Sequence, residues 1–139
     1  MITPFAEAIR ALFNADSTYA VAVPGEISPE QIAQSNTTRP AAVYSNVTDD
    51  GFTSLDGPED GLGNCSMDFQ VVCNTVAEVK AAEAAIKAII RTNRVRKVVG
   101  SNTLYALQFG SASMAIQDIS DGNDEPFYVL TIPISGWIT

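Results

Sequence analysis

Histidine is absent from the 139 residues of this chain. Without an imidazole there is no serine–histidine or cysteine–histidine pair for nucleophilic catalysis, no histidine ligand for zinc, and no side chain that ordinarily titrates near neutral pH. Most common enzyme mechanisms lose their central residue in such a chain. We therefore expect a protein that is not an enzyme, and no catalytic residue is predicted.

Basic residues are scarce as well, with 8 Lys and Arg against 16 Asp and Glu and a formal net charge of −8. This excess of negative charge disfavours non-specific attraction to nucleic acid or to anionic lipid. No apolar run approaches the roughly 20 residues that span a bilayer, and the first residues lack the basic and apolar regions of a signal peptide. We expect a soluble, unsecreted protein with no membrane partner.

Cysteine is limited to Cys65 and Cys73, which lie eight residues apart in one predicted strand. At ~3.3 Å of rise per residue they are separated by roughly 26 Å, which is far beyond the reach of a disulfide bond. We expect two free thiols that serve as small buried apolar groups.

Two acidic stretches resemble calcium loops in part. The stretch that begins at Asp121 has Pro126 where such a loop needs glycine, and the stretch that begins at Asp56 has Met67 where the closing glutamate belongs. The glycines at 57, 61 and 63 are not followed by a lysine or a helix start, as a phosphate-binding loop requires. No metal site and no cofactor site are predicted.

Two segments have the pattern of amphipathic helices. In the first, Thr3 and Pro4 are suited to a helix start, and the apolar stripe that begins with Phe5 continues to about Asn14. In the second, Thr75 and Glu78 form a capping box before an alanine-rich run with apolar residues at helical spacing. The sequence predicts helices over 3–14 and from 75 to about 92.

Several segments have the composition of strands. The clearest is 65–73, where every odd position is apolar and the even positions are mostly polar. Further strands are predicted at 40–47, 103–109, 113–119 and 127–138, with a short one at 19–23. Because Pro133 cannot donate a hydrogen bond, the last strand is expected to lie at a sheet edge or to be bulged there, and a free edge favours oligomerisation.

The order of helix, strands, helix and strands predicts one α+β domain over residues 1–139. We expect a mainly antiparallel sheet with two helices packed on one face. Residues 49–63 carry four Gly, one Pro and five carboxylates, a composition that favours a long, flexible acidic loop.

Positive charge is concentrated in one place, since six of the eight basic residues fall between Lys80 and Lys97. The densest part, at the end of the second predicted helix, can be explained as a solvated helix C-terminus whose dipole favours cations. It can also be one half of an electrostatic interface, with the acidic loop of a neighbouring copy as the other half. The candidate interface residues are Arg91, Arg94, Arg96, Lys97, Asp49, Asp50, Asp56, Glu59 and Asp60.

The order of these features resembles the tail terminator (tail completion) proteins of long-tailed bacteriophages. After the N-terminal helix, the segments that carry the resemblance are Val43–Val47 behind Pro40, Leu55-Asp56-Gly57 with Gly61-Leu62, Phe69–Thr75, the alanine-rich helix and Phe127–Ile132. The resemblance covers nearly the whole chain. It rests on the order and spacing of these motifs, since none of them carries catalytic residues.

The resemblance implies a structural virion protein rather than an enzyme. Copies would form a homohexameric ring at the head-proximal end of the tail, stop polymerisation of the tail tube and join the tail to the head. The implied partners are the tail tube protein, a head completion or connector protein, and genomic DNA that passes through the ring without specific binding. The implied location is the tail or neck of the virion, assembled in the host cytoplasm.

Two other functions remain open from the sequence. The nearer one is another ring of the neck or tail, such as a head completion protein or a tail tube subunit, because sequence patterning separates these poorly from a terminator. The more distant one is a small ligand-binding α+β domain, which would need an apolar pocket with buried polar groups. Assembly discriminates within the first group, because a tube subunit polymerises without limit whereas a terminator stops at one ring.

Overall fold

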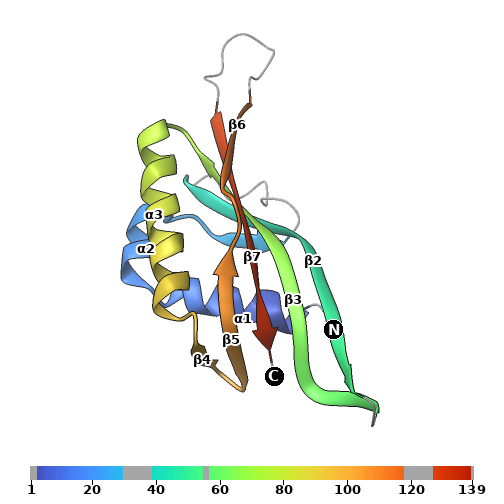
Figure 1. The fold of residues 1–139 in the computed structure, drawn as a ribbon. Helices are drawn as coiled ribbons and strands as arrows, with labels where there is room; N and C mark the ends of the chain where they lie inside the picture. The colour runs from blue at the N-terminus through green and yellow to red at the C-terminus, as the bar shows by residue number, and fades with distance from the viewer. Residues whose placement is uncertain (1–2, 30–38, 55–56, 118–126, 139) are drawn as a thin grey trace.

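The computed structural model describes residues 3–29, 39–54, 57–117 and 127–138, and it forms one α+β domain (Figure 1). Within these residues there are three helices: α1 (Thr3–Asn14), α2 (Ser17–Ala22) and α3 (Val76–Thr92). The strands are β1 (Ile27–Pro29), β2 (Ala41–Ser54), β3 (Gly57–Cys73), β4 (Arg96–Val99), β5 (Asn102–Phe109), β6 (Ser113–Gln117) and β7 (Phe127–Ile138). The predicted fold class is confirmed, and so are helices at the two places where the sequence predicts them.

The strands form one curled sheet in the order β1-β2-β3-β7-β5-β4, with β6 also paired to β7. The pairing of β1 with β2 is parallel, whereas all the other pairings among the described strands are antiparallel. β3 and β7 form the centre of the sheet through a continuous ladder from Gly63–Ile138 to Cys73–Tyr128. The sheet is therefore mainly antiparallel, as predicted.

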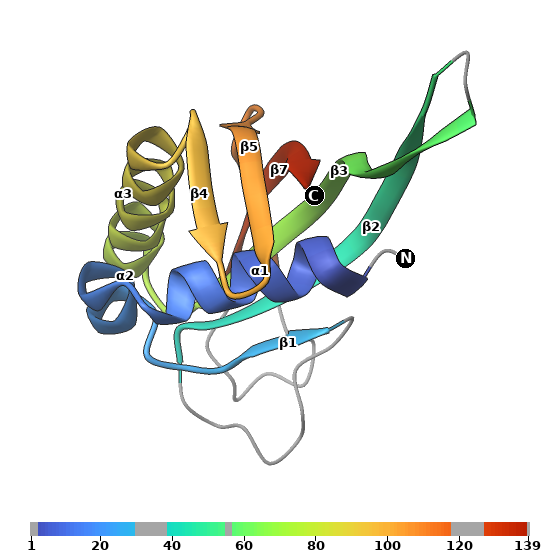
Figure 2. The ribbon, with the colours of Figure 1, turned by 90° about the horizontal axis from the view of Figure 1, so that it is seen from below.

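The core lies between the helices and one face of this sheet. α1 packs against β2, β4 and β5, and α3 packs against β3, β5 and β7. In β7 the even-numbered side chains from Leu130 onward face this core, while the odd-numbered ones are half-buried on the opposite face. Figure 2 shows the helices grouped together, with a long β2–β3 hairpin extending away from them.

The capping box at the start of α3 is confirmed in its main contact. The Thr75 hydroxyl accepts a hydrogen bond from the Glu78 backbone N–H at 3.2 Å. The Glu78 carboxylate accepts from the backbone N–H of Asn74 at 3.0 Å, one residue earlier than the usual geometry requires. The first contact satisfies a backbone donor that the first helical turn leaves free, and the second ties the residue before the cap to the helix.

A helix replaces the strand predicted at 19–23. The Asp16 side chain accepts a hydrogen bond from the Tyr19 backbone N–H at 2.8 Å and so caps α2. A strand would place Tyr19, Val21 and Val23 on one face, but Val21 is 84% exposed while the other two are buried. Only the helix allows Tyr19 to reach the core without burying Val21, and the strand prediction is wrong for this reason.

Pro133 lies in the middle of the sheet and not at an edge, because β7 has β3 on one side and β5 and β6 on the other. The Pro133 carbonyl accepts a hydrogen bond from Gly110, which lies between β5 and β6. In an antiparallel ladder the N–H and C=O of one residue point to the same neighbouring strand. The missing N–H of Pro133 therefore faces the interruption between β5 and β6, where the ladder is broken, so the edge alternative is wrong and β7 offers no free edge here.

Residues 49–63 form most of the outer part of the β2–β3 hairpin, where the sequence predicts a loop. Asp50 pairs with Asn64, Gly51 with Gly63 and Thr53 with Pro58. This correction has a simple reason: main-chain hydrogen bonds continue the ladder begun in the core, and they need no apolar side chains. Residues 55 and 56 lie outside the described residues.

Both cysteines are free thiols buried on the core face of β3, as predicted. Burial raises the pKa of the Cys73 thiol to about 11, and the negative charge of Glu78 contributes to the rise. The folded state thus favours the neutral thiol, whereas an unfolded chain ionises its cysteines from about pH 8.5 to 9.

We expect part of the stability to be lost at alkaline pH because of Cys73. The raised pKa stabilises the fold fully below about pH 8.5, and this contribution disappears as pH rises through the folded-state value of about 11. Urea unfolding between pH 8 and 11 should show a steeper loss of unfolding free energy in the natural protein than in Cys73→Ala. Equal slopes in the two proteins would contradict the assignment.

Candidate interaction surface

The four cations predicted at the end of a helix lie at the end of α3, in the turn that follows it and on β4. Arg91 is in the last turn of α3, and Arg94 follows the C-cap residue Asn93. Arg96 and Lys97 belong to β4, where they pair with Tyr105 and Leu104 of β5. β4 is not predicted from the sequence, because four residues after a helix give too short a pattern to distinguish a strand.

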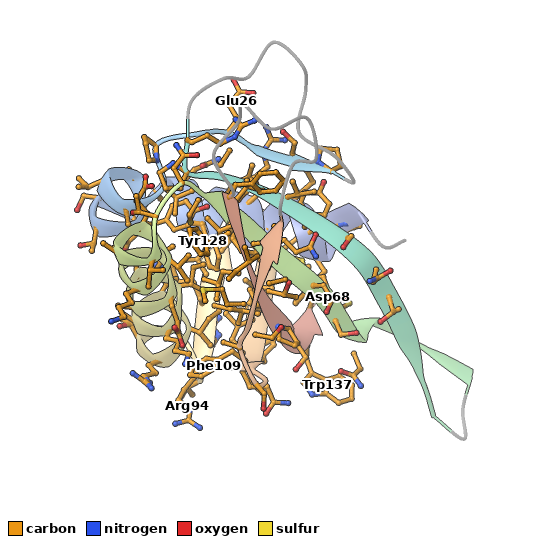
Figure 3. All side chains as sticks on the ribbon, turned by 90° about the horizontal axis from the view of Figure 1, so that it is seen from above. Glu26, Asp68, Arg94, Phe109, Tyr128 and Trp137 are labelled. Atoms are coloured by element: carbon orange, nitrogen blue, oxygen red, sulfur yellow. The ribbon has the colours of Figure 1, made fainter. Side chains whose placement is uncertain are left out.

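Arg91 and Arg94 line a hollow of about 210 Å³ at the junction of α3 and β5. Its other lining residues are Ile90, Leu107, Gln108 and Phe109. We call this hollow the arginine notch. Figure 3 shows Arg94 and Phe109 close together beyond the end of α3.

Two cations flank the ring of Phe109 in the arginine notch. The Arg91 guanidinium carbon lies 5.4 Å from the ring centroid, and the Lys87 Nζ lies 5.3 Å from it. Such cation–π contacts contribute about 0.5–1 kcal/mol each at exposed sites. Lys87 and Phe109 are not among the interface residues predicted from the sequence. Lys87 could have been found there, because it precedes Arg91 by one helical turn and so lies on the same helix face.

The charges of these cations are compensated unequally. Lys87 forms a 2.7 Å ion pair with Glu83 on the same helix. Neither Arg91 nor Arg94 has a carboxylate partner within the described part of the chain, and the same holds for Arg96 and Lys97 on β4. This end of the molecule therefore presents positive charge to solvent in a chain whose net charge is −8.

Four of the five predicted acidic residues belong to the β2–β3 hairpin, at the opposite end of the molecule. Asp49 and Asp50 are in the outer part of β2, Glu59 and Asp60 are in the outer part of β3, and Asp56 lies outside the described residues. Figure 2 shows this end of the hairpin on the far side from α3 and β4. The fold does not bring the acidic and basic groups together within one copy.

A second exposed feature is the β6–β7 hairpin, which projects beyond α3 in Figure 1. In the described part of the sheet the outer edge of β6 has no strand beside it. Met114 and Ile116 of this strand are 47% and 61% exposed. β6 therefore presents a free strand edge in the described part of the sheet, whereas β7 does not.

An apolar hollow of about 800 Å³ lies between α2 and the start of α3. Val21, Ala22, Pro24, Pro40, Ala77 and Ala81 form most of its wall. Of its polar members, the Glu78 carboxylate already accepts hydrogen bonds at the start of α3, from the Asn74 backbone N–H and the Thr75 hydroxyl. The wall is thus mostly apolar, and the one carboxylate among its described residues is engaged in the helix cap and not free to orient a small ligand.

Neither a cluster of metal-ligating side chains nor a membrane-spanning helix occurs among the described residues. No group of three or more Cys, Asp or Glu side chains there is placed to hold a metal ion. No helix among them is long and apolar enough to cross a membrane.

Comparisons with known proteins identify a shared fold. No protein-family model and no curated protein matches the sequence. A chain in the solved structure "Virion of native gene transfer agent (GTA) particle" superposes with a TM-score of 0.68 at 13% sequence identity. The match covers 96% of this chain and 93% of that chain, so the two share one architecture over nearly their full lengths.

Proposed function

We propose that this chain is a structural subunit of a phage-like virion, and that it acts as a tail terminator. The observation that carries the proposal is the fold shared with a chain of a gene transfer agent virion over 96% of this sequence. The order of the motifs, which resembles tail terminator proteins, points to the same role. In this role the copies form a hexameric ring that stops tail tube polymerisation and joins tail to head.

The charge distribution supports a ring. The arginines at the end of α3 and the acidic residues in the outer part of the β2–β3 hairpin lie at opposite ends of one subunit (Figure 2). Unlike surfaces at two ends of a subunit give head-to-tail contacts, which close into a ring when the rotation between neighbours allows it. Six identical contacts of this kind form the proposed hexamer.

The faces of this ring would contact the tail tube protein on one side and a head completion or connector protein on the other. The exposed β6–β7 hairpin, with Met114 and Ile116, is suited to one of these contacts because it projects from the body of the subunit. Genomic DNA would pass through the ring without specific binding, consistent with the net charge of −8. The subunit is then a virion component of the tail or neck, assembled in the host cytoplasm.

A second function fits the same structural match, because the matched chain is part of a whole virion particle and the shared fold does not separate one ring of a virion from another. The chain can be a head completion protein or a tail tube subunit with the same fold. A tube subunit polymerises without limit, whereas a terminator stops after one ring.

Particles made without this protein should consist of full heads and unjoined tails of uncontrolled length. Terminator loss removes both the stop signal of the tube and the docking face for the head. Electron microscopy of lysates from a null mutant measures both effects, and supplying the gene in trans is the control. Normal joined particles would exclude the proposal, and the complete absence of tails would favour the tube subunit.

A further inference from the structure

The arginine notch has the features of a binding site. The proposed ring does not by itself say what binds there. We propose that the notch receives carboxylates from the β2–β3 hairpin of a neighbouring copy. This inference rests on the proposed function, since it requires a ring, and it names the contact that holds the ring together. It also divides the four predicted cations, assigning the contact to Arg91 and Arg94 and not to Arg96 and Lys97.

The notch is built on rigid elements. Phe109 ends β5 and pairs with Ile134 of the central strand β7. The ring of Phe109 contacts Lys87 and Arg91 from one helix face. Because the Lys87 ammonium is already paired with Glu83, it helps to fix the ring and leaves Arg91 and Arg94 as the cations open to a new partner. A preorganised guanidinium loses less side-chain entropy when it binds.

The chemistry of the notch favours a carboxylate. A guanidinium presents a planar fork of N–H donors that matches the two oxygens of a carboxylate, and such pairs are roughly twice as strong as neutral hydrogen bonds. Gln108 adds an amide group to the same wall. A hollow of about 210 Å³ accepts one or two acidic side chains.

The occupant is identified by charge and by place. The chain carries five carboxylates between Asp49 and Asp60. Four of them, Asp49, Asp50, Glu59 and Asp60, belong to the outer part of the β2–β3 hairpin, on the far side of the molecule from the notch. They cannot fill the notch of their own subunit, but in a head-to-tail ring they face the notch of the next one. Duplex DNA is the weaker candidate, because the net charge of −8 repels it and two arginines in a small hollow do not form an extended phosphate-binding surface.

Charge reversal tests the contact in a way that distinguishes it from general electrostatics. The notch-reversed variant is Arg91→Glu with Arg94→Glu, and the hairpin-reversed variant carries Lys in place of Asp49, Asp50, Glu59 and Asp60. The matched control is Arg96→Glu with Lys97→Glu, which has the same charge change as the notch-reversed variant but lies on β4. Native mass spectrometry measures the ring fraction, and circular dichroism verifies that each variant is folded.

We expect each reversed variant alone to lose at least ten-fold in ring fraction, while the control keeps its rings. An equimolar mixture of the two reversed variants should form rings again, because alternating subunits restore opposite charges at every contact. Those rings should contain equal numbers of the two variants. If the notch-reversed variant does not fold, Arg91→Gln with Arg94→Gln replaces it, and the same loss of rings is expected.

The outcomes separate this inference from the proposed function. If the natural protein forms rings and the notch variants form them equally well, the inference is overturned while the terminator proposal stands. Failure of the mixture to restore rings also overturns the inference. If the natural protein forms no rings, the proposed ring fails and the inference with it. Salt-dependent binding of duplex DNA, lost in the notch variants without any change in assembly, would assign the notch to DNA and overturn the inference.

Discussion

Phe69→Ala should lower the free energy of unfolding by about 3–5 kcal/mol, the range typical of removing a buried phenylalanine. Phe69 lies in the central strand β3 and is 0% exposed. Its ring meets Phe13 of α1 edge-on at 4.9 Å and lies 6.4 Å from Tyr19 of α2. The substitution therefore opens a cavity where two helices meet the sheet, and it can remove much of the roughly 5–15 kcal/mol that stabilises a typical domain.

Tyr19→Phe is the matched control for this experiment. It keeps the 5.2 Å ring contact with Phe13 and removes a buried hydroxyl that has no hydrogen-bond partner among the described residues. The loss of such a group should change the unfolding free energy by no more than about 1 kcal/mol, or stabilise the fold. Urea denaturation of both variants measures the difference, and equal effects would contradict the assigned role of Phe69.

Replacing residues 51–63 by an Asn-Gly turn should leave the domain folded but reduce ring formation and head-to-tail joining at least ten-fold. Asp50 and Asn64 are a cross-strand pair, so the short turn can connect them without a change of register. The ladder of β3 with β7 continues from Asn64 to Cys73, so the core strand keeps its neighbours. What is lost is the projecting end that, by the proposal, reaches the next subunit.

A full-length hairpin without charged side chains separates the effect of hairpin length from the effect of its negative charge. This variant carries Asn at 49, 50, 56 and 60 and Gln at 59, so that all five carboxylates of the segment are neutralised while the length of both strands is kept. If the shortened and the uncharged variants both lose their rings, the carboxylates make the contact. If only the shortened variant loses its rings, the contact depends on the length of the hairpin and not on its charge. Joined particles at the natural yield with the short hairpin would refute the role of this segment.

The sequence alone determined the elements whose signals are local. The capping box of Thr75 and Glu78 and the apolar spacing that follows place α3 to within a residue, because both depend on neighbours within one or two turns. The period-two pattern of 65–73 identified the buried face of β3 in the same way. The density of cations before Lys97 was also visible, since charge can be counted without a fold.

Only the tertiary structure decided the features that depend on distant partners. Pro133 is tolerated in a central strand because the interruption between β5 and β6 lies beside it. Residues 49–54 and 57–63 are strand because their backbones continue a ladder anchored in the core. The pairing of β5 with β7 holds Phe109 at the position where its ring contacts Lys87 and Arg91 of α3. The separation of the basic and acidic ends follows from the same sheet order. Strand pairing joins segments that are far apart along the chain, and local composition carries little information about which segments will meet.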